Sequence, residues 1–188
     1  MDLTRTPEEE MLVHAARGVL ARTGTLADVR ALARDPHGFD PARWRELAAL
    51  GWLGMELPGE YGGGGLGFLA TAFLLEEMGR VLLPSPFVAT VAIAAPLIAA
   101  LGSDAQRRRW LPAMAAGTGV ATLALVEPGW RDPFGVPALA PDGALRLDGT
   151  KLFVPFAPDA AVLLVAVAGP GLLAIQRGAP GVACTRQA

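Results

Sequence analysis

The sequence predicts an α+β fold in which an N-terminal all-α helical bundle precedes an incomplete antiparallel β-barrel or sandwich domain. Apolar residues recur at helical spacing through the first part of the chain, and capping residues separate the runs. After Gly117 the runs become short and partly β-branched, with turns rich in glycine and proline between them. Because helices and strands come in separate blocks, we expect a helical domain over residues 1–117 and a partial middle β domain over residues 118–188.

The first three helices are marked by their capping residues. Thr6 is followed three residues later by Glu9, so the first helix is expected to begin there with a capping box. A weaker helical pattern covers residues 26–34. The third helix is expected to begin after Asp40, whose side chain suits an N-terminal cap, and to end at Gly51.

The rest of the helical block contains one loop and three more helices. Four consecutive glycines at residues 62–65 disfavour regular structure and predict a loop whose backbone approaches another group closely. Two buried helices are expected over residues 66–82 and 87–101, the second with a kink at Pro96. A final helix is expected to begin at Ser103 with a second capping box.

The β domain is predicted from short apolar runs that glycine and proline punctuate. Such runs read as strands because they are too short for helices and are bounded by turn residues. They cover residues 119–126, 144–147, 152–154, 161–168 and 172–176.

Composition excludes several classes of function. The formal net charge of −2 gives no electrostatic footprint for nucleic acid, and the arginines at residues 107–109 are expected to form a solvated helix face. The single cysteine, Cys184, fits a reducing cytosol, and His14 and His37, the only histidines, give no ligand-spaced cluster for a metal. The most apolar window, residues 87–101, is shorter than the roughly 20 residues of a membrane span. A cytoplasmic protein without a membrane partner is expected.

The most specific local pattern lies in the β domain. An apolar strand ends in Glu127 and Pro128, and a turn at residues 147–151 (LDGTK) is followed by Phe153. Together with three patterns in the helical block, this arrangement resembles the acyl-CoA dehydrogenase family. The matching segments are residues 47–63 (LAALGWLG through PGEYGG), 76–79 (EEMG), 102–117 (GSDAQ through WLP to glycine), and 124–128 with 147–154. Their order and spacing make the resemblance far more specific than any one of them.

The resemblance implies a helical bundle, a β domain and a second helical bundle. It also implies FAD as cofactor, an acyl-CoA substrate desaturated between Cα and Cβ, and an electron-transfer flavoprotein as acceptor. The family's catalytic carboxylate comes from the C-terminal bundle, which this sequence is expected to lack, so no catalytic residue is assigned. Glu76, Glu77 and Glu127 do not match the position of that base.

The resemblance also implies six positions that contact FAD and one near the substrate. The FAD positions are Leu123, Leu125, Val126, Phe153, Val154 and Pro155, and the substrate position is Asp132. The alternative is that these residues only fill the core of the β domain.

Several of these positions depart from the family pattern. Val126 stands in place of a threonine and Pro155 in place of a threonine or serine, so two side-chain donors are lost. Residues 130–133 (WRDP) replace small residues and a serine, and the carboxylate of Asp132 would repel a phosphate group nearby. Phe153 keeps an aromatic ring where the family has tryptophan. Weakened FAD binding is therefore expected.

Three hypotheses follow for function. The chain belongs to an FAD-dependent acyl-CoA dehydrogenase with a drifted motif, or to the degenerate partner subunit of a heteromeric one, as in bacterial steroid side-chain degradation. The third is a binding or structural protein that keeps the fold without the reaction. Clustering of the losses in one site favours the partner subunit, and a homo- or hetero-oligomer with another acyl-CoA dehydrogenase subunit is expected.

Overall fold

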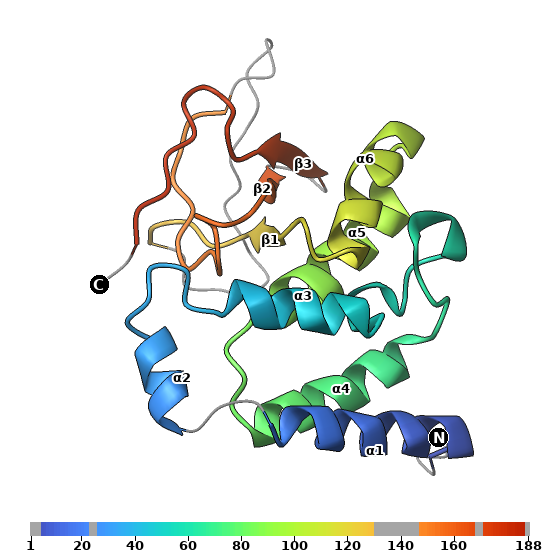
Figure 1. Ribbon diagram of the computed structural model, residues 1–188. Helices are drawn as coiled ribbons and strands as arrows, with labels where there is room; N and C mark the ends of the chain where they lie inside the picture. The colour runs from blue at the N-terminus through green and yellow to red at the C-terminus, as the bar shows by residue number, and fades with distance from the viewer. Residues whose placement is uncertain (1–4, 23–25, 130–146, 168–170, 187–188) are drawn as a thin grey trace.

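The computed structural model describes residues 5–22, 26–129, 147–167 and 171–186. In these residues a block of helices is followed by a three-stranded sheet, which confirms the α+β fold and its order (Figure 1). All the described α-helices end by Ala115, and the first described strand begins at Ala121.

The first three helices are α1 (Pro7–Leu20), α2 (Leu26–Leu32) and α3 (Pro41–Ala49). The predicted capping box of α1 is present: the Glu9 amide donates to Thr6 Oγ1 at 3.2 Å, and the Thr6 amide donates to Glu9 Oε2 at 2.8 Å. Asp40 accepts from the Ala42 amide at 2.8 Å and caps α3. These starts were predictable because each depends on residues within one helical turn.

The remaining helices are α4 (Phe68–Arg80), the π-helix η3 (Val88–Ala94), α5 (Ala95–Leu101) and α6 (Asp104–Ala115). The single helix expected over residues 87–101 thus changes from π to α hydrogen bonding at Ala95, next to Pro96, where a kink was expected. Proline has no N–H to continue the wider pattern. Ser103 opens α6 with the predicted capping box.

The glycine-rich loop lies against its own chain. It follows two short 3-10 helices, η1 (Trp52–Gly54) and η2 (Gly59–Tyr61). A Cβ atom on Gly63 would lie 1.9 Å from the Leu57 carbonyl oxygen, so no larger residue fits there without moving the backbone. The close approach predicted for this loop is therefore to neighbouring backbone.

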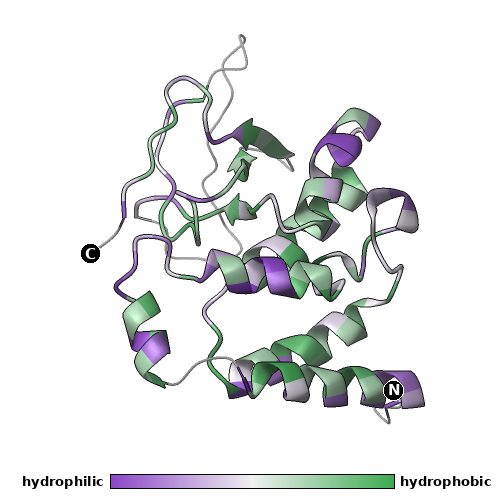
Figure 2. Cartoon of the chain, in the orientation of Figure 1, coloured by the Kyte–Doolittle hydropathy of each residue, from purple (hydrophilic) through white to green (hydrophobic). Residues whose placement is uncertain are grey.

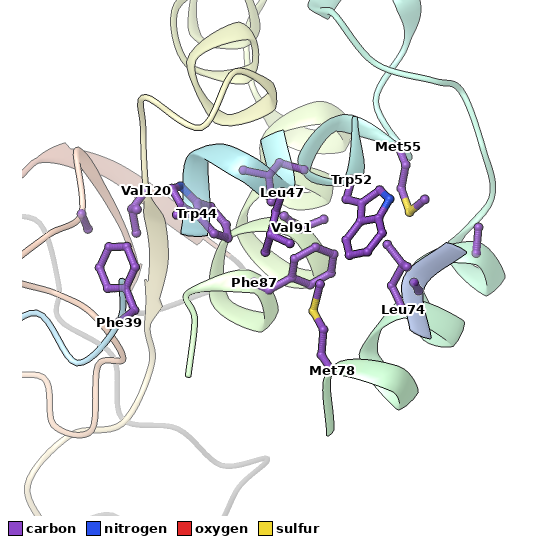
Figure 3. Packing of buried hydrophobic residues seen from close by; sticks show 14 of the residues in the cluster. Phe39, Trp44, Leu47, Trp52, Met55, Leu74, Met78, Phe87, Val91 and Val120 are labelled. Carbon is purple, nitrogen blue, oxygen red and sulfur yellow. The ribbon is translucent and has the colours of Figure 1, made fainter. Parts of the chain in front are cut away.

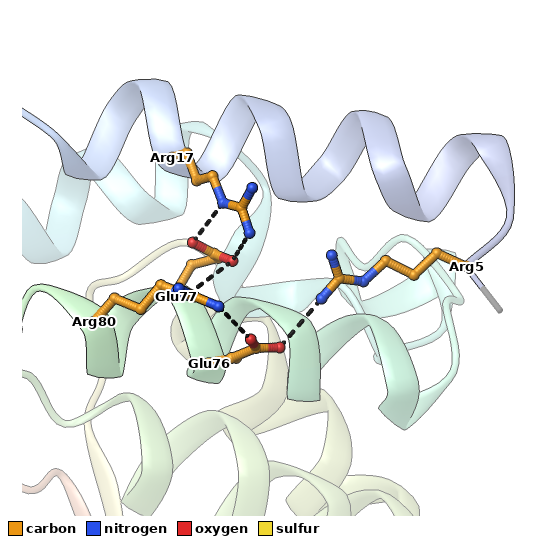
Figure 4. A network of polar contacts seen from close by, with 5 residues as sticks. All are labelled: Arg5, Arg17, Glu76, Glu77 and Arg80. Atoms are coloured by element: carbon orange, nitrogen blue, oxygen red, sulfur yellow. Dashed lines mark hydrogen bonds and ion pairs between the residues drawn. The ribbon is translucent and has the colours of Figure 1, made fainter. Parts of the chain in front are cut away.

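Helices α1 and α4 lie side by side and are joined by a charged network (Figures 1 and 4). The Arg17 guanidinium donates to both carboxylate oxygens of Glu77, at 3.0 and 2.9 Å, and Arg80 lies 3.4 Å from the same carboxylate. Glu76 pairs with Arg5 at 3.2 Å and with Arg80 at 2.7 Å. Alternating charges of opposite sign thus fix the exposed seam between these helices.

The sheet contains β1 (Ala121–Ala124), β2 (Val162–Val167) and β3 (Gly171–Gln176), in that spatial order. The β2–β3 pair is antiparallel as expected, but β1 and β2 run parallel, with Ala121 opposite Val162, so the sheet is mixed. A parallel pair needs a long crossover, which the chain between β1 and β2 provides. The described sheet is open, not a closed barrel.

Of the five predicted strand segments, the one over residues 152–154 is not a strand in the structure, and the one over residues 144–147 is left untested. Residues 144–146 of the latter lie outside the described residues. Residues 152–154 contribute only an isolated antiparallel bridge between Leu152 and Val126. Phe153 has φ of 54°, outside the β region, so the ladder stops there.

A continuous apolar core joins the helices to one face of the sheet. Trp44, Leu47 and Trp52 from the α3 region pack with Leu74, Met78, Phe87 and Val91, as Figure 3 shows. The same cluster reaches Val120, Ala124, Leu163 and Val165 around and in the sheet. The opposite face, with Ala121, Val162 and Leu164, packs against α5 and α6 through Ile98 and Leu111. Figure 2 shows the strands to be predominantly hydrophobic, in keeping with the burial of β1 and β2 on both faces.

Candidate cofactor-facing site

The end of β1 lies beside the turn that contains Lys151. The Leu152 amide donates to the Val126 carbonyl oxygen at 2.8 Å, which brings Val126 next to the segment of Phe153. The structure therefore brings together the two halves of the motif that the sequence singled out.

A nearly buried ion pair reinforces this contact. Lys151 Nζ lies 2.6 Å from Glu127 Oε1, and the two side chains are 6% and 14% exposed. The same Nζ donates to the Leu125 carbonyl oxygen at 3.2 Å. Removing one partner of such a pair leaves an uncompensated charge, so the pair strongly favours the observed register of the two segments.

Phe153 is held in an unusual conformation beside this pair. Its side chain is 71% exposed, and its φ of 54° is uncommon for a residue other than glycine. Phe156, three residues later, has φ of 53°. Such conformations cost of order 1–3 kcal/mol each and persist where the surrounding contacts determine them.

A cavity of about 860 Å³ lies on the sheet face that carries Ala124, Leu163 and Val165. Residues 153–155 line it, together with residues 149–152 and 156–159 on either side, the loop at residues 36–38 and the segment at residues 181–186. Leu123 points the other way, because successive strand residues alternate, and packs against the cluster formed by α5 and α6.

The structure therefore places the predicted FAD positions in different environments. Residues 153–155 lie at the cavity, whereas Leu123 packs on the opposite face of the sheet. Leu125 and Val126 are half-buried at the end of β1, where they meet Lys151 and Leu152. Asp132, with the rest of residues 130–133, lies outside the described residues.

The chemistry of these side chains does not fit the polar edge of a flavin. Val126, Val154 and Pro155 have no side-chain hydrogen-bond donor, and proline also lacks the backbone N–H. The exposed ring of Phe153 offers an apolar surface on which a flat ring system can pack. The described side chains at these positions therefore provide stacking surface but no hydrogen-bond donor.

The three glutamates that stand out in the sequence are all held in ion pairs. Glu77 is 2% exposed, and its hydrogen bonds from Arg17, opposed by burial, lower the pKa of its carboxyl. Glu76 bonds Arg5 and Arg80 in the same network, and Glu127 bonds Lys151. These partners give each carboxylate a structural role.

One contact at the cavity was not predicted. His37 Nδ1 contacts the Asp159 carboxylate, although the two residues are 122 positions apart in the chain. This hydrogen bond raises the pKa of His37 above its ordinary value. Local sequence carries no signal for such a pair, since each residue also reads as an ordinary turn residue.

Comparison with known proteins places these features in a family. Residues 6–118 match the model of the acyl-CoA dehydrogenase N-terminal domain, which is more than half of the chain. The chain belongs to the acyl-CoA dehydrogenase family. The helical block is thus the family's N-terminal domain. It includes residues 36–38, which line the cavity, and the glycine-rich loop.

Among individual acyl-CoA dehydrogenases, FadE27 of Mycobacterium tuberculosis is 29% identical over 98% of this chain and 50% of its own length. FadE12 of the same organism is 41% identical over 49% of this chain and 24% of its own length. The chain thus spans about half the length, or less, of the curated relatives it matches.

Solved acyl-CoA dehydrogenase structures extend the likeness over the sheet. The ChsE4-ChsE5 complex from Mycobacterium tuberculosis has a TM-score of 0.87 at 28% identity, over 98% of this chain and 51% of that chain. A variant of the Tcur3481-Tcur3483 steroid ACAD has a TM-score of 0.84 at 40% identity, over 93% of this chain and 49% of that chain.

In the described part of the chain, no helix is both long and apolar enough to cross a membrane.

Proposed function

We propose that this chain is part of a subunit of a heteromeric acyl-CoA dehydrogenase that desaturates the thioester of a steroid side chain between Cα and Cβ. In this proposal a partner subunit supplies FAD and the catalytic base, and this chain completes the assembly and shapes the acyl pocket. Residues 1–117 form its helical domain and residues 118–188 the first part of its β domain. The acceptor is an electron-transfer flavoprotein.

The observation that carries the proposal is the clustered loss of flavin donors in an otherwise intact family fold. Both capping boxes, the glycine-rich loop and the Lys151–Glu127 pair are in place. Val126 and Pro155 nevertheless lack the donors that the family pattern has there. A chain that drifted at random would lose features throughout the fold, whereas Val126 and Pro155 lie on the two segments that the bridge between Val126 and Leu152 joins.

The two similar structures support the choice of partner and substrate. One is a complex of two differently named chains, and the other is a steroid acyl-CoA dehydrogenase named by two components. The steroid protein is 40% identical to this chain.

A second candidate is an acyl-CoA dehydrogenase that binds FAD by itself through a drifted motif. Phe153 favours it, because the residue is 71% exposed and lies where an aromatic residue would pack against a flavin in the family pattern. In this case Leu123, Leu125 and residues 153–155 contribute backbone and apolar contacts. A non-catalytic acyl-CoA-binding protein is the remaining alternative.

Co-expression with a sister acyl-CoA dehydrogenase subunit distinguishes the three candidate functions. The full-length protein is purified alone and together with a sister acyl-CoA dehydrogenase subunit, and desaturation of a steroid-CoA thioester is measured with electron-transfer flavoprotein as acceptor. The partner-subunit proposal predicts activity only for the complex. Equal activity of the full-length protein alone, in excess FAD, would contradict it and favour the second candidate; inactivity of both preparations would favour the binding protein.

A further inference from the structure

The loop between α2 and α3 contacts the segment before β2 through His37 and Asp159, which carry opposite charges when the imidazole is protonated. His37 Nδ1 contacts the Asp159 carboxylate, and the backbone N–H of His37 donates to Asp35 Oδ1 at 2.8 Å. The His37 side chain is 54% exposed, so solvent protons reach it, whereas Asp159 is mostly buried. The imidazole can therefore exchange protons with solvent while it contacts a residue from a distant part of the chain.

Two further contacts converge on the same loop. The rings of Phe39 and Phe156 meet edge to face with centroids 5.6 Å apart. The Arg186 guanidinium donates to the carbonyl oxygens of Ala33 and Asp35, both at 3.0 Å. The loop is thus held by the segment before β2 and by the segment after β3.

These contacts form one wall of the cavity of about 860 Å³. His37, Phe156, Asp159 and Arg186 all line it. The turn that carries Phe156 and Asp159 directly follows residues 153–155, and the positive φ angles of Phe153 and Phe156 must be maintained by contacts around them. The His37 contact is one of the few on this wall that proton binding can weaken or strengthen near neutral pH.

We propose that His37 and Asp159 form a pH-sensitive latch that holds residues 153–159, and with them this wall of the cavity, against the loop between α2 and α3. Protonation of His37 strengthens the latch, and loss of the proton weakens it. This proposal does not depend on the proposed function, because it concerns contacts within the chain alone.

The two carboxylates near His37, those of Asp159 and Asp35, both favour its protonated form. Asp159 faces it from the segment before β2, and Asp35 lies on its own loop; the hydrogen bond to Asp159 is the main cause of the raised pKa of His37. Arg186 bonds the carbonyl oxygens of the same loop and keeps its charge at these pH values. A raised folded-state pKa means that the stabilisation of the latch by the charged imidazole is fully present below the ordinary value of 6.5 and is lost as the pH rises through the folded-state pKa.

Two measurements on the full-length protein test the latch. Nuclear magnetic resonance gives the pKa of His37, which we expect above 6.5 in the wild type and shifted back toward 6.5 in Asp159→Asn. Hydrogen exchange of residues 153–159, corrected for intrinsic rates, is then compared about one pH unit on either side of the measured pKa. We expect a loss of protection above the pKa.

The two histidines provide a matched control. His37→Gln should remove the pH dependence of exchange in residues 153–159, and exposed His14→Gln should retain it. A wild-type His37 that titrates at or below 6.5, or equal corrected exchange on both sides of its pKa, would overturn the proposal. The wild-type measurements decide this even where a variant fails to fold.

Discussion

In the proposed partner subunit, Val126 and Pro155 are the residues that lack the flavin donors of the family pattern. Each buried acceptor left without a donor costs about 1–3 kcal/mol, so restoring a donor should recover part of this free energy. The double variant Val126→Thr/Pro155→Thr of the full-length protein is therefore expected to bind FAD at least about tenfold more tightly, as measured by fluorescence titration. Val88→Thr, an exposed change elsewhere, is the control. Unchanged FAD affinity in the double variant would show that these positions do not limit binding.

Lys151 and Glu127 supply a second test at the scale of single residues. Lys151→Met should lower the free energy of unfolding by about 3–5 kcal/mol, because it leaves the Glu127 carboxylate nearly buried without a cation. Adding Glu127→Gln removes that charge, so the double variant should lose less than the sum of the two single variants. Urea denaturation measures all three, and strictly additive losses would mean that the pair is not coupled.

Contacts between side chains distant in sequence are the part of the site that the sequence could not predict. Glu127 and Lys151 were both noted in a family motif, but their ion pair crosses 24 positions. The His37–Asp159 contact crosses 122 positions and belongs to no motif. Residue type and local spacing carry no information on such pairs until the fold brings them together.

At the scale of elements, the helix starts and the antiparallel β2–β3 pair were predictable, and the pairing of β1 with β2 was not. Thr6, Asp40 and Ser103 cap their helices as expected, because capping depends on the next three residues. The parallel pairing of β1 with β2 depends on a crossover between distant segments. The strand expected over residues 152–154 is replaced by an isolated bridge, since Phe153 adopts a positive φ that its residue type does not predict.

Thr90 joins the π-helix η3 to strand β1. Its buried hydroxyl donates to the Ala121 carbonyl oxygen at 2.9 Å and accepts from the Ala121 amide at 3.1 Å. Thr90→Val keeps the shape but leaves both backbone groups unpaired, which should cost about 1–3 kcal/mol of unfolding free energy in urea denaturation. Thr118→Val removes an exposed hydroxyl bond to Ala113 and should cost clearly less. Equal losses in the two variants would contradict a specific role for Thr90.

The ion-pair network between α1 and α4 should make helix packing sensitive to acid. The pKa of Glu77 is depressed chiefly by its hydrogen bonds from Arg17, so the carboxylate stabilises the fold above its ordinary pKa of 4.5. That contribution is lost as the pH falls through the depressed folded-state value. We expect Glu77→Gln to be less stable than wild type at neutral pH, and the difference in urea denaturation to shrink in acid. A difference independent of pH would point to packing instead.

At the scale of the whole molecule, the helical block and the sheet share one apolar core, with the cavity on one sheet face. Family membership and the α+β order were both predictable, because they rest on motifs spread along the chain. What the structure adds is the spatial grouping of residues 153–155 with the His37–Asp159 wall. The proposal that the partner subunit, and not this chain, supplies FAD depends on whether this region binds FAD.

The FAD content of the purified full-length protein tests that division most directly. Absorbance spectra are recorded for the protein alone and for its complex with a co-expressed sister acyl-CoA dehydrogenase subunit, each after removal of free FAD. We predict little bound flavin in the protein alone, and stoichiometric flavin together with dehydrogenase activity in the complex. Stoichiometric FAD in the protein purified alone would contradict a partner subunit that has lost its flavin site.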